Sequence, residues 1–326
     1  MALSGLNKVG LKLILFGGKG GVGKTSCATA TAIELSKKYR TLLISADPAH
    51  SVSDSLEQPI GYRLRKVNGV ANLTAIEIAA DEAFSTFKQK HETELKKLFD
   101  TSTNLDHEDI DQLMSLSIPG IDEVMSFKTI IDFIEEGEFE KYVVDTAPTG
   151  HVLRLLASSK LLDEWIKVAA QMRWKYRYLI TSFSGGYKPD DTDTMLLNLK
   201  KTVKRIEALL SDETSCEFIP VSIPELMAVK ETGRLLADLD KYQVTSRQLV
   251  VNHVMESGSC DFCTRRKMAQ QKYLDQLYEM YGKQYNITRV PMFPEEVKGI
   301  ETLNTLRSIL FSSEMEDDQG DVIEKS

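Results

Sequence analysis

The residues best suited to chemistry form a glycine-rich run near the start of the chain. The run consists of Gly18, Lys19, Gly20, Gly21, Val22, Gly23, Lys24 and Thr25, and Ser26 follows it. Glycines let successive backbone N–H groups turn toward one anion, so this run can surround the phosphates of a nucleotide. The Lys24 amine is placed to reach the β- and γ-phosphates, and the Thr25 hydroxyl to bind Mg²⁺. The run therefore predicts a phosphate-binding loop that holds a nucleoside triphosphate.

Lys19 is an additional lysine at the entrance to this loop. We expect its amine to point away from the loop's own phosphates, so it could cross to a nucleotide held by another subunit. A positive charge supplied in this way would stabilise phosphoryl transfer, as an arginine finger does. The alternative is a solvated lysine on a surface loop. The setting within a phosphate-binding loop favours the role in trans.

Two aspartates follow apolar runs that read as strands. Asp47 comes after residues 41–45, where a carboxylate could orient or deprotonate an attacking water. The alternative for Asp47 is a plain Asp-Pro turn. Asp145 ends a second run and suits an acid that holds Mg²⁺ through a water. The loop at 146–151 can change shape and sense the γ-phosphate, and we expect His151 in it to be a hydrogen-bonded residue and not a base.

Cys260 and Cys263 form a Cys-x₂-Cys pair without a second pair in the chain. A structural zinc takes four ligands, and neither Cys27 nor Cys216 is well placed to complete the set. A symmetric dimer would bring two copies of the pair together at its axis and make a four-cysteine site. Two alternatives stay open, a redox pair and unpaired structural cysteines. Zinc shared across a dimer is the favoured interpretation.

The elements that must position these residues alternate between strand and helix. Near-continuous apolar runs, typical of central strands in a parallel sheet, lie at 13–16, 41–45, 73–78, 142–145, 218–221, 248–252 and 287–290. We predict an α/β fold with a doubly wound, mostly parallel sheet. Its ATPase core would comprise 1–80, 137–150 and 216–311. A discontinuous helical subdomain would comprise 81–136 and 151–215, followed by a disordered acidic tail at 312–326.

Composition narrows the class of partner. The chain has 326 residues, a formal net charge of −8 and four cysteines. The acidic balance argues against a nucleic-acid partner, and the few cysteines are typical of the reducing cytoplasm. No apolar stretch approaches the length needed to span a bilayer. The two helical stretches are rich in apolar residues, chiefly Leu and Ile, which predicts either an ordinary core or an open groove for an apolar helix. The residues alone favour the core.

Together these motifs resemble those of the tail-anchored membrane-protein targeting ATPases and their relatives, the arsenite-pump ATPases. The resemblance covers about residues 8–310 and includes the segment Pro119 to Glu123 and the basic helix after Cys263. It implies a P-loop ATPase with a deviant Walker A motif and its signature lysine, Lys19. The chain is similar to single-half homologues of the archaeal or bacterial type.

The resemblance also implies roles for particular residues. Asp47 would be the hydrolytic residue of the first switch, and Asp145 would begin the second. Residues that match further nucleotide contacts are Glu225, Asn252, Pro291 and Phe293. The Asn252 amide could pair with the edge of adenine, which would favour ATP over GTP. Cys260 and Cys263 match the zinc ligands, with one Zn²⁺ per homodimer.

In this family the helical insertions form a groove across the dimer that shields a client's transmembrane helix. ATP and Mg²⁺ close the dimer, hydrolysis relaxes it, and a membrane receptor accepts the client in the cytoplasm.

Two rival functions remain. An arsenite pump usually fuses two such halves and carries a cysteine trio, whereas this chain is one half long and lacks the trio. A positioning ATPase binds membrane through a C-terminal amphipathic helix, but the tail at 314–318 is acidic and would be repelled by anionic lipid. The helical stretches hold few methionines, which argues against a broad range of apolar clients.

Overall fold

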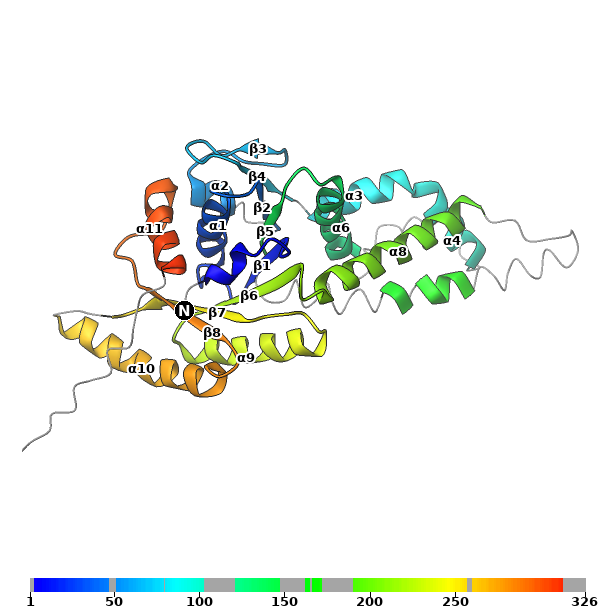
Figure 1. Ribbon diagram of the computed structural model, residues 1–326. Coiled ribbons are helices and arrows are strands. Elements are labelled where there is room, and N and C mark those ends of the chain that lie inside the picture. The colour runs from blue at the N-terminus through cyan, green and yellow to red at the C-terminus, as the bar shows by residue number, and fades with distance from the viewer. Residues whose placement is uncertain are drawn as a thin grey trace, which may run out of the picture.

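An eight-stranded sheet forms the centre of the protein (Figure 1). The computed structural model describes residues 3–46, 51–78, 80–102, 121–146, 162–164, 166–171, 190–256 and 260–312. The strand order is β3-β4-β2-β5-β1-β6-β7-β8; β3 and β4 are antiparallel, and the other neighbours are parallel. The strands are β1 (Leu13–Gly17), β2 (Thr41–Ser45), β3 (Arg65–Lys66), β4 (Leu73–Glu77), β5 (Lys141–Asp145), β6 (Cys216–Ser222), β7 (Gln248–Val254) and β8 (Asn286–Pro291).

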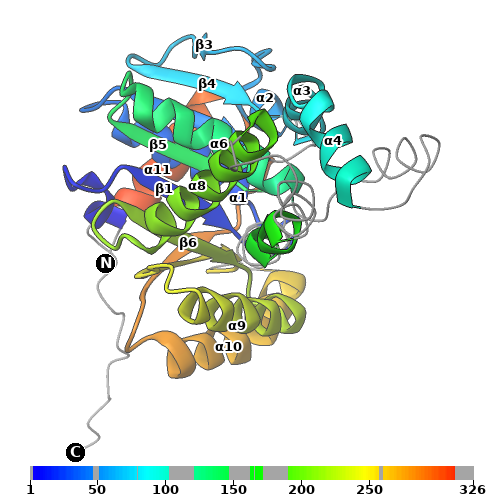
Figure 2. The same cartoon turned by 90° about the vertical axis from the view of Figure 1, so that its right-hand side faces the viewer.

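Helices cover both faces of the sheet because the central strands are apolar on both faces. In β1, Leu13 and Leu15 join one core cluster and Ile14 and Phe16 join the other, as the alternation of a strand requires. The first cluster includes residues of α6 (Ile121–Glu136), α8 (Asp191–Ser211) and α9 (Leu226–Lys241). The second includes residues of the 3-10 helix η1 (Leu3–Asn7), α1 (Lys24–Leu35), α2 (Ser51–Leu56) and α11 (Gly299–Phe311). Helix α10 (Asp261–Tyr281) lies beside α9 (Figure 2).

The strand order reverses at β1. Strands β5, β2 and β4 lie on one side of β1, and β6, β7 and β8 lie on the other. Doubly wound sheets bind ligands outside the carboxyl ends of the strands at such a switch point. The glycine-rich run follows β1 directly, so it occupies this position.

The predicted α/β architecture is confirmed, with each predicted strand present and its ends shifted by at most two residues. Strand β3 was not predicted, because its two residues are polar and exposed and therefore carry no apolar signal. The strand forms by pairing with β4.

The described parts of the two predicted insertions are helical. They contain α3 (Ala80–Lys90), α4 (Glu92–Ser102), α6, α8 and a helical segment at 162–164 and 166–171. Apolar side chains of α6 and α8, such as Ile130 and Val203, are buried in the same cluster as the sheet. The described apolar residues therefore serve largely as core. The domain boundaries and the groove stay predictions, since 103–120 and 172–189 lie outside the described residues.

Lys141 is wholly buried at the amino end of β5, and Asp145 lies at the opposite end of the same strand. Its Nζ donates to the carbonyl oxygens of Leu6 (3.3 Å), Lys8 (2.5 Å) and Leu11. It also lies 4.7 Å from the centre of the Tyr39 ring. This lysine thereby ties the segment before β1 to the sheet. In the described part of the chain, every helix is too short or too polar to cross a membrane.

Candidate nucleotide-binding site

The loop between β1 and α1 is shaped by glycines that no larger residue could replace. Gly23, just before α1, has a φ of 91°, and a Cβ there would lie 2.3 Å from Asn252 Nδ2. Gly18 has a φ of 155°, and a Cβ there would lie 2.2 Å from the Val221 carbonyl oxygen. The N-terminus of α1 then points its free N–H groups toward the loop, where they favour a phosphate. This geometry is that of a phosphate-binding loop.

Oxygen atoms suited to Mg²⁺ meet beside the loop. Thr25 Oγ1 donates to Asp145 Oδ2 over 2.6 Å, and Ser51 Oγ donates to the same atom over 3.1 Å. Asp145 is wholly buried. Hydroxyl and carboxylate oxygens are the donors that Mg²⁺ prefers, so the residues present fit this ion. The sequence pattern assigned Thr25 and Asp145 separately to Mg²⁺ but assigned no role to Ser51, whose contact with Asp145 spans 94 positions.

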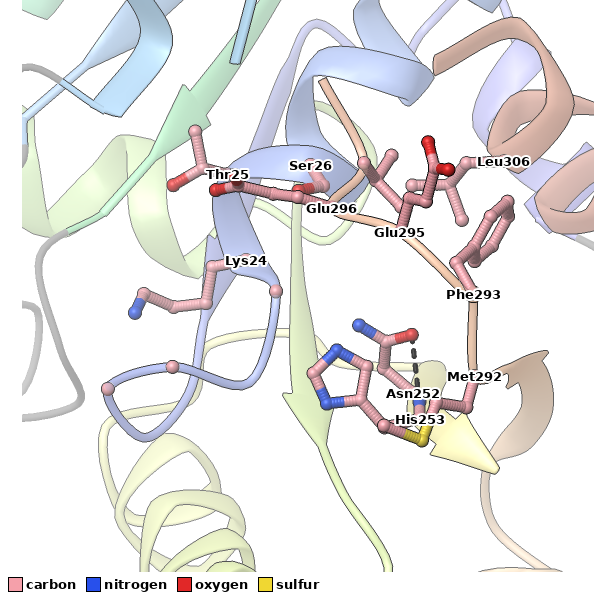
Figure 3. A pocket seen from close by; sticks show the side chains of 14 residues that line it. Lys24, Thr25, Ser26, Asn252, His253, Met292, Phe293, Glu295, Glu296 and Leu306 are labelled. Carbon is pink, nitrogen blue, oxygen red and sulfur yellow. Dashed lines mark hydrogen bonds between the residues drawn. The ribbon is translucent and has the colours of Figure 1, made fainter. Parts of the chain in front are cut away.

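A pocket of about 480 Å³ opens next to these residues (Figure 3). It is lined by Gly20, Gly21, Gly23, Lys24, Thr25 and Ser26 of the loop and α1, by Asn252 and His253 of β7, and by Met292, Phe293, Glu295, Glu296, Val297 and Leu306. Lys24 and the ring of Phe293 lie at opposite sides of it (Figure 3). Phosphates would therefore lie at the Lys24 side and an apolar base at the Phe293 side.

The end of β7 contacts the loop directly. Asn252 Nδ2 donates to the Val22 carbonyl oxygen over 3.0 Å, and Asn252 Oδ1 accepts from the His253 N–H over 2.9 Å. His253 has a φ of 57°, an uncommon conformation for a residue with a side chain. Burial and the nearby Arg266 charge lower the pKa of His253, so its imidazole is neutral at pH 7. His253 lines the pocket but had no predicted role, because the sequence gives no local signal for a positive φ at a histidine.

The other predicted nucleotide contacts are not all at the pocket. Glu225 precedes α9 and pairs with Arg266, with 3.7 Å between Glu225 Oε1 and Arg266 Nη2. Pro291 ends β8, one residue before the pocket lining begins. Asp47, together with residues 147–151, lies outside the described residues. Roles for these residues stay predictions.

The two cysteines of the Cys-x₂-Cys pair lie together at the start of α10. Their Sγ atoms are 3.0 Å apart, and Cys260 Sγ also accepts from the Cys263 N–H. These hydrogen bonds lower the pKa of the Cys260 thiol. Burial raises the pKa of Cys27 to about 12 and also raises that of Cys216, so both are inert. Within the described ranges, no group of three or more His, Cys, Asp and Glu could hold a metal ion. One chain thus supplies two thiols, which is half of a four-cysteine site.

Comparison with known proteins agrees with this geometry. The family model described as "Anion-transporting ATPase" matches residues 11–312. The chain belongs to this family. Among the similar proteins of this ATPase family are an ATPase get3 of Pyrenophora tritici-repentis and an ATPase GET3 of Podospora anserina. They are 32% and 35% identical over 94% of the chain and 92% of each relative.

A third relative, ATPase ASNA1 homolog 1 of Paramecium tetraurelia, is 34% identical over 92% of both chains. The predicted family and the predicted ATPase activity are thereby confirmed. This anion-transporting ATPase family member therefore hydrolyses ATP. Since these relatives come from fungi and a ciliate, the archaeal or bacterial type of the chain stays a prediction.

Proposed function

We propose that this ATPase works as a homodimer that shields the single transmembrane helix of tail-anchored membrane proteins and delivers them through the cytoplasm to a membrane receptor. The main support is its similarity to relatives named get3, GET3 and ASNA1 homolog, of whose length the chain covers 92%. An arsenite pump that fuses two halves would be about twice as long as these relatives. The chain's resemblance to the targeting branch of the family supplies the client class.

In this proposal, the chemistry of hydrolysis belongs to the glycine-rich loop and to two aspartates. The loop N–H groups and Lys24 bind the phosphates. Thr25 and Asp145 would hold Mg²⁺, which would supply positive charge to the phosphate oxygens. Asp47 orients and deprotonates the attacking water. Lys19 of one chain contacts the nucleotide of the other, so the dimer closes when both sites hold ATP. Closure and relaxation reshape a groove formed by the helical insertions.

The dimer is proposed to share one Zn²⁺, bound by Cys260 and Cys263 of each chain. Support comes from two neighbouring thiols that lie exposed or half-buried at one helix end. Four thiolates around one metal are a typical structural zinc site. The expected measurements are one zinc for two chains and a dimer by light scattering. Replacing both cysteines by serine should remove the zinc and weaken the dimer. A wild-type dimer that contains no zinc would refute the bridge.

Co-expression tests the targeting function directly. A protein with one C-terminal transmembrane helix should copurify with the ATPase as a soluble complex, because the helix is shielded from water. The matched control is the same protein without that helix, which should not copurify. Arsenite or antimonite should leave ATP turnover unchanged. Strong stimulation by either metalloid, with no client complex, would favour the pump.

A further inference from the structure

A buried glutamine in α10 contacts the strand end that lines the nucleotide pocket. Helix α10 is mostly exposed, and its buried side chains are Gln270, Leu274 and Leu277. The two leucines pack in an apolar cluster with β7. Gln270 is also buried, with only 5% of its surface exposed, although its side chain is polar and gains little from apolar contact. Its amide must instead find polar partners, because a buried amide without them is costly.

Both ends of the Gln270 amide bond to the backbone of β7 and its exit. Gln270 Nε2 donates to the His253 carbonyl oxygen over 3.0 Å, and Gln270 Oε1 accepts from the Met255 N–H over 2.8 Å. These two backbone groups flank Val254, whose carbonyl oxygen accepts from the Met292 N–H. The side chain thus fixes the backbone on either side of one residue.

The bonds fall where the pairing of β7 with β8 is irregular. The register shifts between Val251 and Val254, so Asn252 and His253 together face one residue of β8. Such a bulge interrupts the ladder and leaves backbone groups in need of other partners. The His253 φ of 57° is strained for a residue with a Cβ and persists only where neighbours fix it. Gln270 provides that fixation.

The bulge in turn sets the position of Asn252. The Asn252 amide bonds to the His253 N–H on one side and to the Val22 carbonyl oxygen of the phosphate-binding loop on the other. A straight strand would turn Asn252 or His253 toward the other face of the sheet, because side chains alternate. A continuous series of hydrogen bonds therefore runs from α10, through the bulge, to the loop.

We propose that Gln270 is a positioning residue for ATP: it holds the β7 bulge in the conformation that presents Asn252 and His253 to the nucleotide. The inference concerns the nucleotide pocket and is independent of the client or of zinc. Gln270 lies on α10 and does not line the pocket. By this proposal it nevertheless determines the affinity for ATP and ADP.

The test compares two adjacent glutamines. Gln270→Leu removes both bonds to the bulge, whereas Gln271→Leu removes a bond to Asp275 on the surface of the same helix. We expect Gln270→Leu to raise the Kd of a fluorescent ADP analogue and the KM for ATP by about tenfold, with kcat within about twofold. Gln271→Leu should change none of these by more than about twofold. A melting temperature for each variant separates affinity from stability.

Two further measurements cover the case in which Gln270→Leu folds poorly. Gln270→Glu keeps the size and the acceptor for Met255 but loses the donor to His253, so we expect an intermediate loss of affinity. Hydrogen exchange of the peptide 248–256 without nucleotide should quicken in both Gln270 variants and not in Gln271→Leu. Wild-type affinity for ADP in a folded Gln270→Glu or Gln270→Leu protein would overturn the proposal. So would an equal loss of affinity in Gln271→Leu.

Discussion

At the scale of single residues, the Thr25 hydroxyl joins the phosphate-binding loop to the buried carboxylate, with 2.6 Å between Thr25 Oγ1 and Asp145 Oδ2. A hydroxyl and a carboxylate side by side are oxygen donors that would suit Mg²⁺. The same helix holds Thr29, one turn later, whose buried Oγ1 has no hydrogen-bond partner among the described residues. The two threonines are a matched pair, one at the site and one in the core.

We predict that Thr25→Val lowers ATP turnover at saturating ATP by roughly tenfold to hundredfold, because Mg²⁺ loses a ligand. Thr29→Val should leave turnover within about twofold, since valine has the same shape and removes a hydroxyl that lies in an apolar cluster. Steady-state assays over a range of Mg²⁺ concentrations measure both. Turnover in Thr25→Val with wild-type dependence on Mg²⁺ would exclude Thr25 as a ligand.

Residues also differ in how far the sequence could predict them. The loop from Gly18 to Ser26 is contiguous, so its spacing alone indicated its chemistry. His253 and Gln270 were not predicted, because their role depends on a bulge in strand pairing and on a contact across 17 positions. Asn252 was assigned to the nucleotide by resemblance; its bond to Val22, across 230 positions, could not be read from the pattern.

At the scale of elements, Lys141 ties the η1 segment to β5 through buried carbonyl oxygens. Burial lowers the pKa of Lys141 from its ordinary value of 10.5 to about 8. Between pH 8 and pH 10.5 the unfolded chain therefore keeps a proton that the folded chain has released. The unfolded state binds more protons in this window, so the lysine's contribution to the free energy of unfolding rises with pH.

We predict that the free energy of unfolding of the wild type minus that of Lys141→Met becomes more positive as pH rises from 8 to 10. The growth should reach at most about 1.4 kcal/mol per pH unit. Urea unfolding of both proteins at several pH values measures it, and the comparison cancels the titration of other groups. A difference that shrinks with pH would mean that the carbonyl oxygens, and not burial, determine the pKa of Lys141.

Helices α1 and α11 are joined by an ion pair between Glu34 Oε2 and Arg307 Nη1, 2.7 Å apart, with both side chains under one-fifth exposed. Lys37 pairs with the same Glu34 oxygen over 2.7 Å but is about half exposed. The two cations therefore contact one carboxylate in different surroundings. Burial should make the Arg307 pair the stronger of the two.

We predict that Arg307→Ala lowers the free energy of unfolding by about 1–2 kcal/mol, because it leaves a partly buried carboxylate with less compensation. Lys37→Ala should change it by less than about 0.5 kcal/mol, since exposed pairs are screened by water. Chemical denaturation at two salt concentrations measures both. Equal effects of the two substitutions would show that burial does not distinguish the pairs.

The strands were predictable because each is a short apolar run, whereas their order was not. The reversal at β1 depends on pairing between segments more than 100 positions apart, such as Leu13 with Tyr142 and Leu13 with Cys216. No local pattern reports such pairing. The apolar faces of α6 and α8 favoured a core, but no local pattern could show that they pack against this sheet, because an apolar helix face does not identify its partner.

At the scale of the whole molecule, the proposed dimer makes a specific prediction about Lys19 and Asp47. Lys19→Met and Asp47→Asn should each abolish turnover when present in both chains. If Lys19 acts across the dimer, a mixed dimer has one site with both groups intact and one site with neither. Random pairing makes half of the dimers mixed, so co-expression of the two variants should restore about a quarter of wild-type turnover.

Two affinity tags, one on each variant, allow the mixed dimer to be purified and assayed alone. It should then have about half of the wild-type turnover, since one of two sites is complete. Absence of any restoration in the purified mixed dimer would place Lys19 beside its own nucleotide. Recovery of a single-chain species throughout would contradict the dimer itself.

The nucleotide pocket takes its walls from residues as far apart in the chain as Gly20 and Leu306. During synthesis on the ribosome, the glycine-rich loop appears early, but the last wall appears only once α11 has been made. A ligand stabilises only the state that binds it. The nascent chain therefore lacks the complete pocket while its earlier strands form, and ATP can stabilise the complete pocket only once α11 has been made.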